Sequence, residues 1–213
     1  MTSFLGIDIG TTALKAALFD PHGHLLAMDC QEYELATPSP AIVELDPEVY
    51  WRALCRTIRA VLAKTGYDPT SITALAFSSQ GETLIPVDSS GAPVRRAIVW
   101  LDNRADEEAA WLENAFAVED TYRTTGQPRV TPGWPACKIL WMRRHEPAVF
   151  ARTAKFLLLE DYLLYRLTGR FATEYCLQSS SLFLDIQKRA WWPEMAAAIG
   201  ISPDQLGDLL SPG

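Results

Sequence analysis

The first stretch that could carry chemistry is Asp8-Ile9-Gly10-Thr11-Thr12, with Lys15 three residues further on. An acid at the end of a strand can hold a hydrated magnesium ion. A glycine lets the backbone approach a phosphate, which successive N–H groups and two hydroxyls can cradle. Lys15 would add positive charge on the same side. A plain hairpin turn, whose threonines bond their own backbone, explains the same residues.

A second polar stretch, Ser78-Ser79-Gln80-Gly81-Glu82-Thr83, interrupts two apolar segments. Loops at strand ends are where α/β proteins place groups that bind ligands. The Gln80 amide and the Glu82 carboxylate could hydrogen-bond the hydroxyls of a polyol. The alternative is a polar connecting loop.

Two further stretches combine aromatic and polar residues. In Trp100-Leu101-Asp102-Asn103-Arg104, Asp102 either caps the following helix and pairs with Arg104, or both face a ligand. Trp134 lies between Gly133 and Pro135 in a loop that leads to Lys138. A large aromatic in a loop indicates either anchoring to the core or binding.

The elements that must position these residues are predicted from apolar periodicity. Short turns link strands 4–9, 14–19 and 24–33 into a β-meander. Residues 37–40 are expected to be loop, and Asp46-Pro47-Glu48 begins a helix that ends at Gly66. The core face of that helix is predicted to be Trp51, Leu54, Cys55, Ile58, Val61 and Leu62.

Farther along, strands and helices alternate. Strands are expected at 72–77 (buried), 84–87 and 97–100, loop at 125–135, and helices at 106–116, 136–145, 159–167 and 192–199. A meander followed by alternating elements predicts one α/β domain with a mixed sheet.

Composition narrows the classes of function. The 213 residues carry 26 acidic and 19 basic side chains, a net charge of −7, which argues against a general nucleic-acid binder. The four cysteines lie too far apart in sequence for a metal site or a disulfide framework. No apolar run is long enough for a signal peptide or a membrane span. We therefore expect a soluble, cytoplasmic protein without nucleic-acid or membrane partners.

Taken in this order, the stretches resemble the N-terminal domain of the FGGY family of carbohydrate kinases. The matching segments are L-G-I-D-I-G-T-T-x-x-K, A-F-S-S-Q-G-E-T, A-I-V-W-L-D-N-R-A, T-G-Q-P, K-I-L-W, K-F-L-L with E-D-Y, and R-L-T-G. The resemblance covers nearly the whole chain. It is strongest to the xylulose-kinase-like, pentulose and polyol branches.

This resemblance implies an α/β, ribonuclease-H-like (actin-like) lobe with a mixed sheet flanked by helices, over residues 1–213. It implies ATP and Mg²⁺ as cofactors, a sugar or polyol as substrate, and a C-terminal ATP lobe absent from this chain; a homodimer stays open. The implied phosphate-binding residues are Asp8, Gly10, Thr11, Thr12 and Lys15, with Asp8 also placing the metal. The implied substrate-binding residues are Gln80, Gly81, Glu82, Asp102, Arg104 and Trp134.

The chain departs from the family pattern at two points. Gly81-Glu82 stands where xylulose kinases usually have Met-His and glycerol kinases Arg-Glu, so the sugar is open. The family's general base is an aspartate in a Gly-Asp motif that opens the second lobe. Gly207-Asp208 is not that motif, because its neighbours resemble the helical segment that precedes it. The base is therefore expected beyond residue 213, and the isolated chain is expected to be inactive.

Two other classes of function remain. One is a non-catalytic sugar-binding or regulatory module derived from a kinase lobe. The other is a non-sugar ATPase of the actin-like superfamily, against which Gln80-Gly81-Glu82 and the W-L-D-N-R stretch count.

Overall fold

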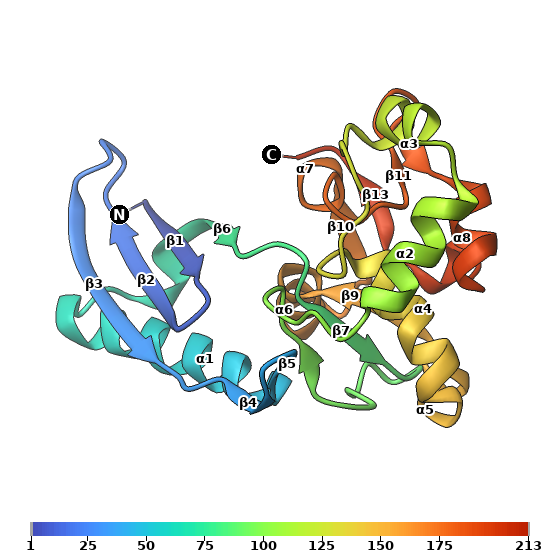
Figure 1. Ribbon diagram of the computed structural model, residues 1–213. Coiled ribbons are helices and arrows are strands. Elements are labelled where there is room, and N and C mark those ends of the chain that lie inside the picture. The colour runs from blue at the N-terminus through green and yellow to red at the C-terminus, as the bar shows by residue number, and fades with distance from the viewer. Residues whose placement is uncertain (1, 213) are drawn as a thin grey trace. The chain divides into compact units, whose positions relative to one another are not determined.

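The computed structural model describes residues 2–212, and their contacts divide them into two compact units (Figure 1). Unit 1 consists of the residues up to Leu35 together with Asp46–Gln80. Unit 2 consists of Ala36–Leu45 and the residues from Gly81 onward. The assignment of 1–213 to one kinase domain stays a prediction; within it, each unit has its own sheet.

Unit 1 contains the predicted meander. Its sheet has the order β3-β2-β1-β6, formed by β1 (Ser3–Ile9), β2 (Ala13–Phe19), β3 (Leu25–Glu32) and β6 (Ile72–Ser79). The first three strands pair antiparallel, whereas β6 pairs parallel with β1, so the sheet is mixed as predicted. The short 3₁₀ helix η1 (Pro69–Ser71) leads into β6.

Helix α1 (Pro47–Thr65) begins and ends where the sequence predicts, and it packs on β2 and β3 (Figure 1). The Asp46 carboxylate accepts a hydrogen bond from the Glu48 N–H, and Pro47 occupies the first turn. Gly66 closes the helix at φ 67°, a left-handed conformation that favours glycine.

The predicted core face of α1 is partly wrong. Its buried residues are Pro47, Tyr50, Ala53, Leu54, Thr57 and Val61. Four of the six residues predicted as core are only half-buried: Trp51, Cys55, Ile58 and Leu62. The buried stripe admits Thr57 because its hydroxyl donates back to the Ala53 carbonyl oxygen at 2.9 Å, which satisfies a polar group in the core.

The prediction of a buried strand at 72–77 is also wrong. Strand β6 pairs with β1 on one side and is an edge strand of the four-stranded sheet that the described residues form. Ala74 and Ala76 are exposed, and Leu75 and Phe77 are half-buried. A continuous apolar run shows that a strand can be buried on both faces, not that both faces are covered.

Unit 2 contains a five-stranded sheet of order β4-β5-β8-β7-β9. Its strands are β4 (Ala36–Ser39), β5 (Ile42–Leu45), β8 (Ala97–Ile98), β7 (Leu84–Val87) and β9 (Lys155–Leu158). The prediction of loop at 37–40 is wrong, because β4 pairs with β5 there. Pro38 is tolerated since β4 lies at a sheet edge, where a missing N–H loses no ladder bond.

The helices of unit 2 are α2 (Asp106–Ala115), α3 (Val118–Thr125), α4 (Pro135–His145), α5 (Pro147–Arg152), α6 (Leu159–Thr168), α7 (Tyr175–Gln178) and α8 (Pro193–Ile199). The predicted helices correspond to α2, α4, α6 and α8, while α3, α5 and the short α7 were not predicted. Helix α4 packs against α2, α5 and α8 (Figure 1). Apolar side chains of α2, α4 and α8 form the core of the unit together with those of β7, β8 and β9, and α5 packs against it with partly buried side chains.

Short elements complete unit 2: β11 (Leu184–Asp185) pairs with β12 (Ala190–Trp191), and β10 (Ala172–Glu174) pairs parallel with β13 (Asp208–Leu210). The expectation of a helical segment around 205–210 is wrong, because the chain there forms the 3₁₀ helix η2 (Pro203–Gln205) and then β13. Gly207 lies so close to Ala172 and Thr173 that a Cβ would meet their backbone at 3.2–3.3 Å. Among the described residues, no helix is both long and apolar enough to cross a membrane.

The Asp161 carboxyl group of α6 is buried with an incomplete set of partners. Its Oδ2 accepts from the Leu158 N–H at 3.0 Å and from the Gln178 amide at 3.2 Å. Its Oδ1 finds no hydrogen-bond partner among the described residues, and neither does Gln178 Oε1. Burial raises the pKa of Asp161 to about 7.

This raised pKa predicts how stability changes with pH. Between about pH 4 and pH 7 the folded protein keeps a proton on Asp161 that the unfolded chain releases, so the free energy of unfolding falls as pH rises through that window. Asp161→Asn should remove this contribution and give a flatter profile. Urea unfolding at pH 4.5, 6 and 8 measures the difference between the two proteins; identical pH slopes would contradict the prediction.

Candidate functional site

The turn between β1 and β2 in unit 1 is held by bonds to the Gly10 backbone. The Gly10 N–H donates to the Ala13 carbonyl oxygen at 2.9 Å. The Gly10 carbonyl oxygen accepts from the Tyr33 hydroxyl and from the Gln80 amide, the latter at 3.2 Å. A Cβ on Gly10 would lie 3.1 Å from the Ala13 oxygen, so this tight turn favours glycine.

Asp8 and Lys15 lie directly opposite each other in the β1–β2 register. The Lys15 ammonium lies 3.2 Å from Asp8 Oδ2, and both side chains are about half exposed, at 50% and 51%. The turn residues Thr11 and Thr12 follow within the same loop. The structure therefore brings an acid, a base and two hydroxyl residues together at one end of the hairpin, as the sequence predicts.

This end of the hairpin offers Mg²⁺ a single carboxylate, that of Asp8. Among residues 2–212, no group of three or more His, Cys, Asp or Glu side chains could hold a metal ion. Mg²⁺, however, is commonly bound through one or two carboxylates, water and substrate phosphates rather than by an all-protein cage. The half-exposed Asp8 carboxylate fits that role.

Gln80 belongs to unit 1, and its side chain supports the turn. Besides its bond to Gly10, its amide lies 3.5 Å from the Tyr50 hydroxyl, and its backbone N–H donates to the Ile9 carbonyl oxygen at 2.9 Å. The predicted substrate residues Gln80 and Glu82 are thus in different units, and Gly81 is the first residue of unit 2 in this part of the chain.

Unit 2 contains a hollow of about 350 Å³ where three of the predicted stretches meet. Its lining residues are Glu82, Trp100, Leu101, Asn103, Thr131, Gly133 and Trp134. They come from the loop before β7, the loop after β8 and the loop before α4. Indole faces beside a carboxylate and an amide are suited to a polyhydroxylated ligand, because they offer apolar surface together with hydrogen-bonding groups.

The backbone at Glu82 is strained. Its φ is 57°, in the left-handed region that non-glycine residues rarely adopt, and the Thr83 N–H donates across it to the Gly81 carbonyl oxygen at 2.7 Å. Such conformations cost on the order of 1–3 kcal/mol and cluster at ligand-binding sites. The conformation persists because its neighbours fix it: the Thr83 hydroxyl accepts from the Trp100 N–H at 3.1 Å.

Asp102 is fully buried behind this hollow. Its carboxylate accepts from the Val43 N–H at 2.6 Å and from the Arg104 guanidinium at 2.8 and 2.9 Å. The predicted pairing with Arg104 is confirmed, but the predicted helix cap is wrong: α2 has Ala105 at its N-cap and no side-chain cap. Asp102 instead ties β5 to the loop after β8.

Arg104 extends this contact into a partly buried chain of charges. Its guanidinium also reaches Glu44, at 2.8 Å, and Glu44 pairs with Arg95, which pairs with Glu146 at 2.7 Å. The Arg104 guanidinium lies over the Trp141 ring, 4.9 Å from its centroid. Asp102 and Arg104 do not line the hollow. Their contact with substrate stays a prediction. In the structure, both residues bond to β5, Asp102 through the Val43 N–H and Arg104 through Glu44.

Trp134 is anchored to the core, as one of its two predicted roles requires, and its contact with substrate stays a prediction. It lines the hollow and also packs against the apolar core of unit 2. Its indole N–H donates to the Arg129 carbonyl oxygen at 3.2 Å. Trp100 was not among the predicted substrate residues, although the stretch that contains it was singled out. Because it is 39% exposed and lines the hollow, it is the residue that the sequence analysis most clearly missed.

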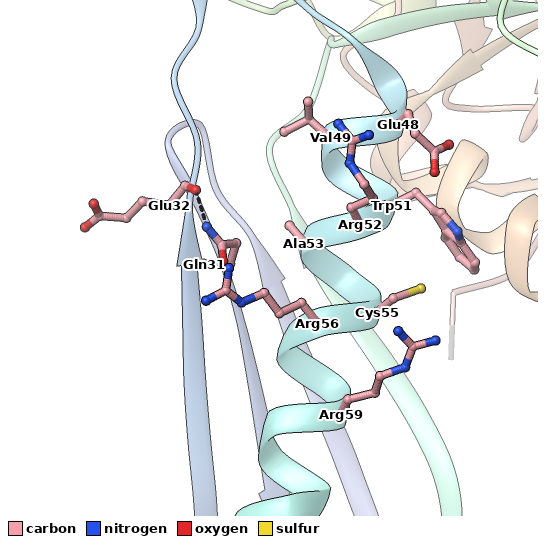
Figure 2. A pocket seen from close by; sticks show the side chains of 10 residues that line it. All are labelled: Gln31, Glu32, Glu48, Val49, Trp51, Arg52, Ala53, Cys55, Arg56 and Arg59. Carbon is pink, nitrogen blue, oxygen red and sulfur yellow. Dashed lines mark hydrogen bonds between the residues drawn. The ribbon is translucent and has the colours of Figure 1, made fainter.

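A larger hollow, of about 530 Å³, lies in unit 1 between β3 and α1. None of the predicted phosphate-binding or substrate-binding residues lines it. Figure 2 shows that the side chains of Arg52, Arg56 and Arg59 spread in different directions, with Arg56 toward Gln31 and Arg59 on the other side of the helix. Trp51 and Cys55, expected in the core, line this hollow. The guanidinium groups do not converge on a common point.

The mixed sheet of unit 1, the antiparallel five-stranded sheet of unit 2 and the helices around them define an α/β protein of the actin-like ATPase fold, as predicted. The chain belongs to the FGGY family of carbohydrate kinases: the model of the family's N-terminal domain matches residues 3–213.

Individual relatives agree with this family. The chain is 34% identical to the xylulose kinase of Escherichia coli over 95% of its own length and 41% of that protein. It is 29% identical to the gluconokinase of Bacillus licheniformis over 99% of its own length and 40% of that protein. The structure of a ligand-bound xylulose kinase from Lactobacillus acidophilus matches with a TM-score of 0.92 and 28% identity. The match covers 100% of this chain and 42% of that protein. The chain therefore spans about two fifths of the proteins it matches.

The buried contact of Asp102 generates a stability prediction. Asp102→Ala should lower the free energy of unfolding by about 3 kcal/mol, because it leaves the Val43 N–H without its buried partner and leaves Arg104 with Glu44 alone. Lys188→Ala is the control: it removes an ion pair whose lysine is 79% exposed, and it should cost at most about 1 kcal/mol. Chemical denaturation measures both, and equal losses would contradict the structural role of Asp102.

Proposed function

We propose that the chain is the sugar-binding lobe of an ATP-dependent kinase whose substrate is a ketopentose or a polyol. The observation that carries the proposal is the hollow of unit 2, where the Glu82 loop meets Trp100 and Trp134. Family membership supports the reaction class. In this proposal, the nucleotide lobe and the general base lie outside residues 1–213.

In the proposed reaction, a substrate hydroxyl oxygen bonds to the γ-phosphorus of ATP while the bond from that phosphorus to the ADP oxygen breaks. The hydroxyl proton passes to an aspartate outside this chain. Such transfer depends on positioning and on charge neutralisation rather than on covalent chemistry by the protein.

Each unit has its own proposed task. In unit 2, Glu82 accepts hydrogen bonds from substrate hydroxyls while the indoles of Trp100 and Trp134 pack on the apolar face of the sugar carbons. In unit 1, the hydroxyls of Thr11 and Thr12 and the Lys15 ammonium bind the transferred phosphate. Mg²⁺, when bound beside Asp8, would neutralise phosphate charge.

The role of Glu82 is tested by Glu82→Gln in the full-length protein encoded by the source gene. The amide keeps the shape of the side chain but loses its charge, and hydrogen bonds to charged groups are worth about 1.5–3 kcal/mol. The KM for the sugar should rise roughly 10- to 150-fold, while the KM for ATP should stay within about twofold. Steady-state kinetics with either substrate varied measures this, and an unchanged sugar KM would refute the role.

The isolated 213-residue chain should turn over no ATP in response to sugar. The reason is that the proposed base and nucleotide lobe lie elsewhere. A coupled ADP-release assay with a panel of ketopentoses and polyols checks this. Sustained, sugar-dependent ADP release by the isolated chain would contradict the proposed division of labour, and micromolar sugar binding without turnover would favour a binding module.

A further inference from the structure

Lys138 is a buried charge that the proposed reaction does not use. It lies in the first turn of α4, and its side chain is completely buried among residues of the unit 2 core. Both features are unfavourable for a cation, because burial removes water and the N-terminal end of a helix carries partial positive charge. Burial accordingly lowers the pKa of Lys138 to about 7. A lysine placed at such cost indicates a specific task.

The Lys138 ammonium bridges two loops of the hollow. It donates to the Glu82 carbonyl oxygen at 2.9 Å and to the Val99 carbonyl oxygen at 3.1 Å. Glu82 itself lines the hollow, and Val99 directly precedes Trp100, which also lines it. One buried group therefore fixes the backbone beneath the carboxylate and beneath the indole.

The nearby carboxylates do not compete for this ammonium. Asp102 and Glu82 both favour the charged form of Lys138 by their negative charge, yet neither makes an ion pair with it within 4 Å in the described part of the chain. The Asp102 oxygens are taken by Val43 and Arg104. The direct partners of Lys138 are thus the two backbone carbonyls.

The bond to Glu82 acts where the backbone is strained. Glu82 has a φ of 57°, and a rotation about its N–Cα bond that relieved the strain would carry its carbonyl oxygen away from Lys138. The bond opposes that rotation, and with it any movement of the Glu82 carboxylate out of the hollow.

We propose that Lys138 is a positioning residue that holds Glu82 and Trp100 at the spacing the sugar requires. The expected effect on the KM for the sugar rests on the proposed function. The expected loosening of the two loops does not. Two measurements on the full-length protein separate these.

The first measurement is amide hydrogen exchange, which needs no substrate. Lys138→Met should speed exchange at residues 81–84 and 99–101 by about tenfold or more. Lys155→Met is the matched control, because the Lys155 ammonium also donates to two carbonyl oxygens of unit 2, those of Asp204 and Leu206, away from the hollow. Equal exchange of the two loops in wild type and Lys138→Met would overturn the proposal. If Lys138→Met does not fold, Lys138→Gln is read in the same way.

The second measurement is a double-mutant cycle on kinetics. Lys138→Met alone should raise the KM for the sugar about tenfold or more without changing the KM for ATP, whereas Lys155→Met should change neither. In the Glu82→Gln background the same substitution should add less than about threefold, because the carboxylate that Lys138 holds in place is already absent. Full additivity would overturn the role through Glu82. If the wild-type protein phosphorylates no sugar, the proposed function fails, while hydrogen exchange still decides whether Lys138 holds the two loops.

Discussion

The hollow of unit 2 depends on buried charges that bond to backbone groups. Asp102 accepts from the Val43 N–H, and Lys138 donates to the carbonyl oxygens of Glu82 and Val99. Because unpaired buried polar groups are costly, each of these bonds fixes a loop that has little regular secondary structure of its own. The apolar core of α2, α4 and α8 then supplies the rigid base behind them. The lining side chains are placed by this polar layer rather than by the strands alone.

In unit 1, hydrogen bonds to the backbone hold the turn between β1 and β2. Its meander brings Asp8 opposite Lys15, and its turn is held because one carbonyl oxygen, that of Gly10, accepts from both Tyr33 and Gln80. Burial raises the pKa of Tyr33 and of Tyr50, so both stay neutral hydrogen-bonding groups at physiological pH. A turn proposed to bind phosphate must keep its shape without a regular ladder, and these contacts hold the backbone of this one.

Much of the fold could be predicted from local signals, and the errors have physical causes. The caps of α1 and the short turns of the meander are local, so the sequence predicts them well. The burial of β6 and of the α1 face depends on what packs against them, which periodicity does not report. The motifs located Glu82 and Trp134 in the hollow, but Trp100 and Lys138 needed the structure, because their importance comes from contacts between distant segments. The part of Asp102 in holding β5 was hidden for the same reason.

If this chain is the sugar-binding part of a carbohydrate kinase, as proposed, the full-length protein must phosphorylate a sugar or a polyol. The most direct test incubates the full-length protein with ATP, Mg²⁺ and each of a panel of ketopentoses, polyols and gluconate, and follows ADP release together with the phosphorylated product. We predict ADP release that is strictly dependent on a ketopentose or a polyol, with one phosphate transferred per ADP formed. Absence of a phosphorylated product with every member of the panel, or ADP release that is independent of sugar, would contradict it.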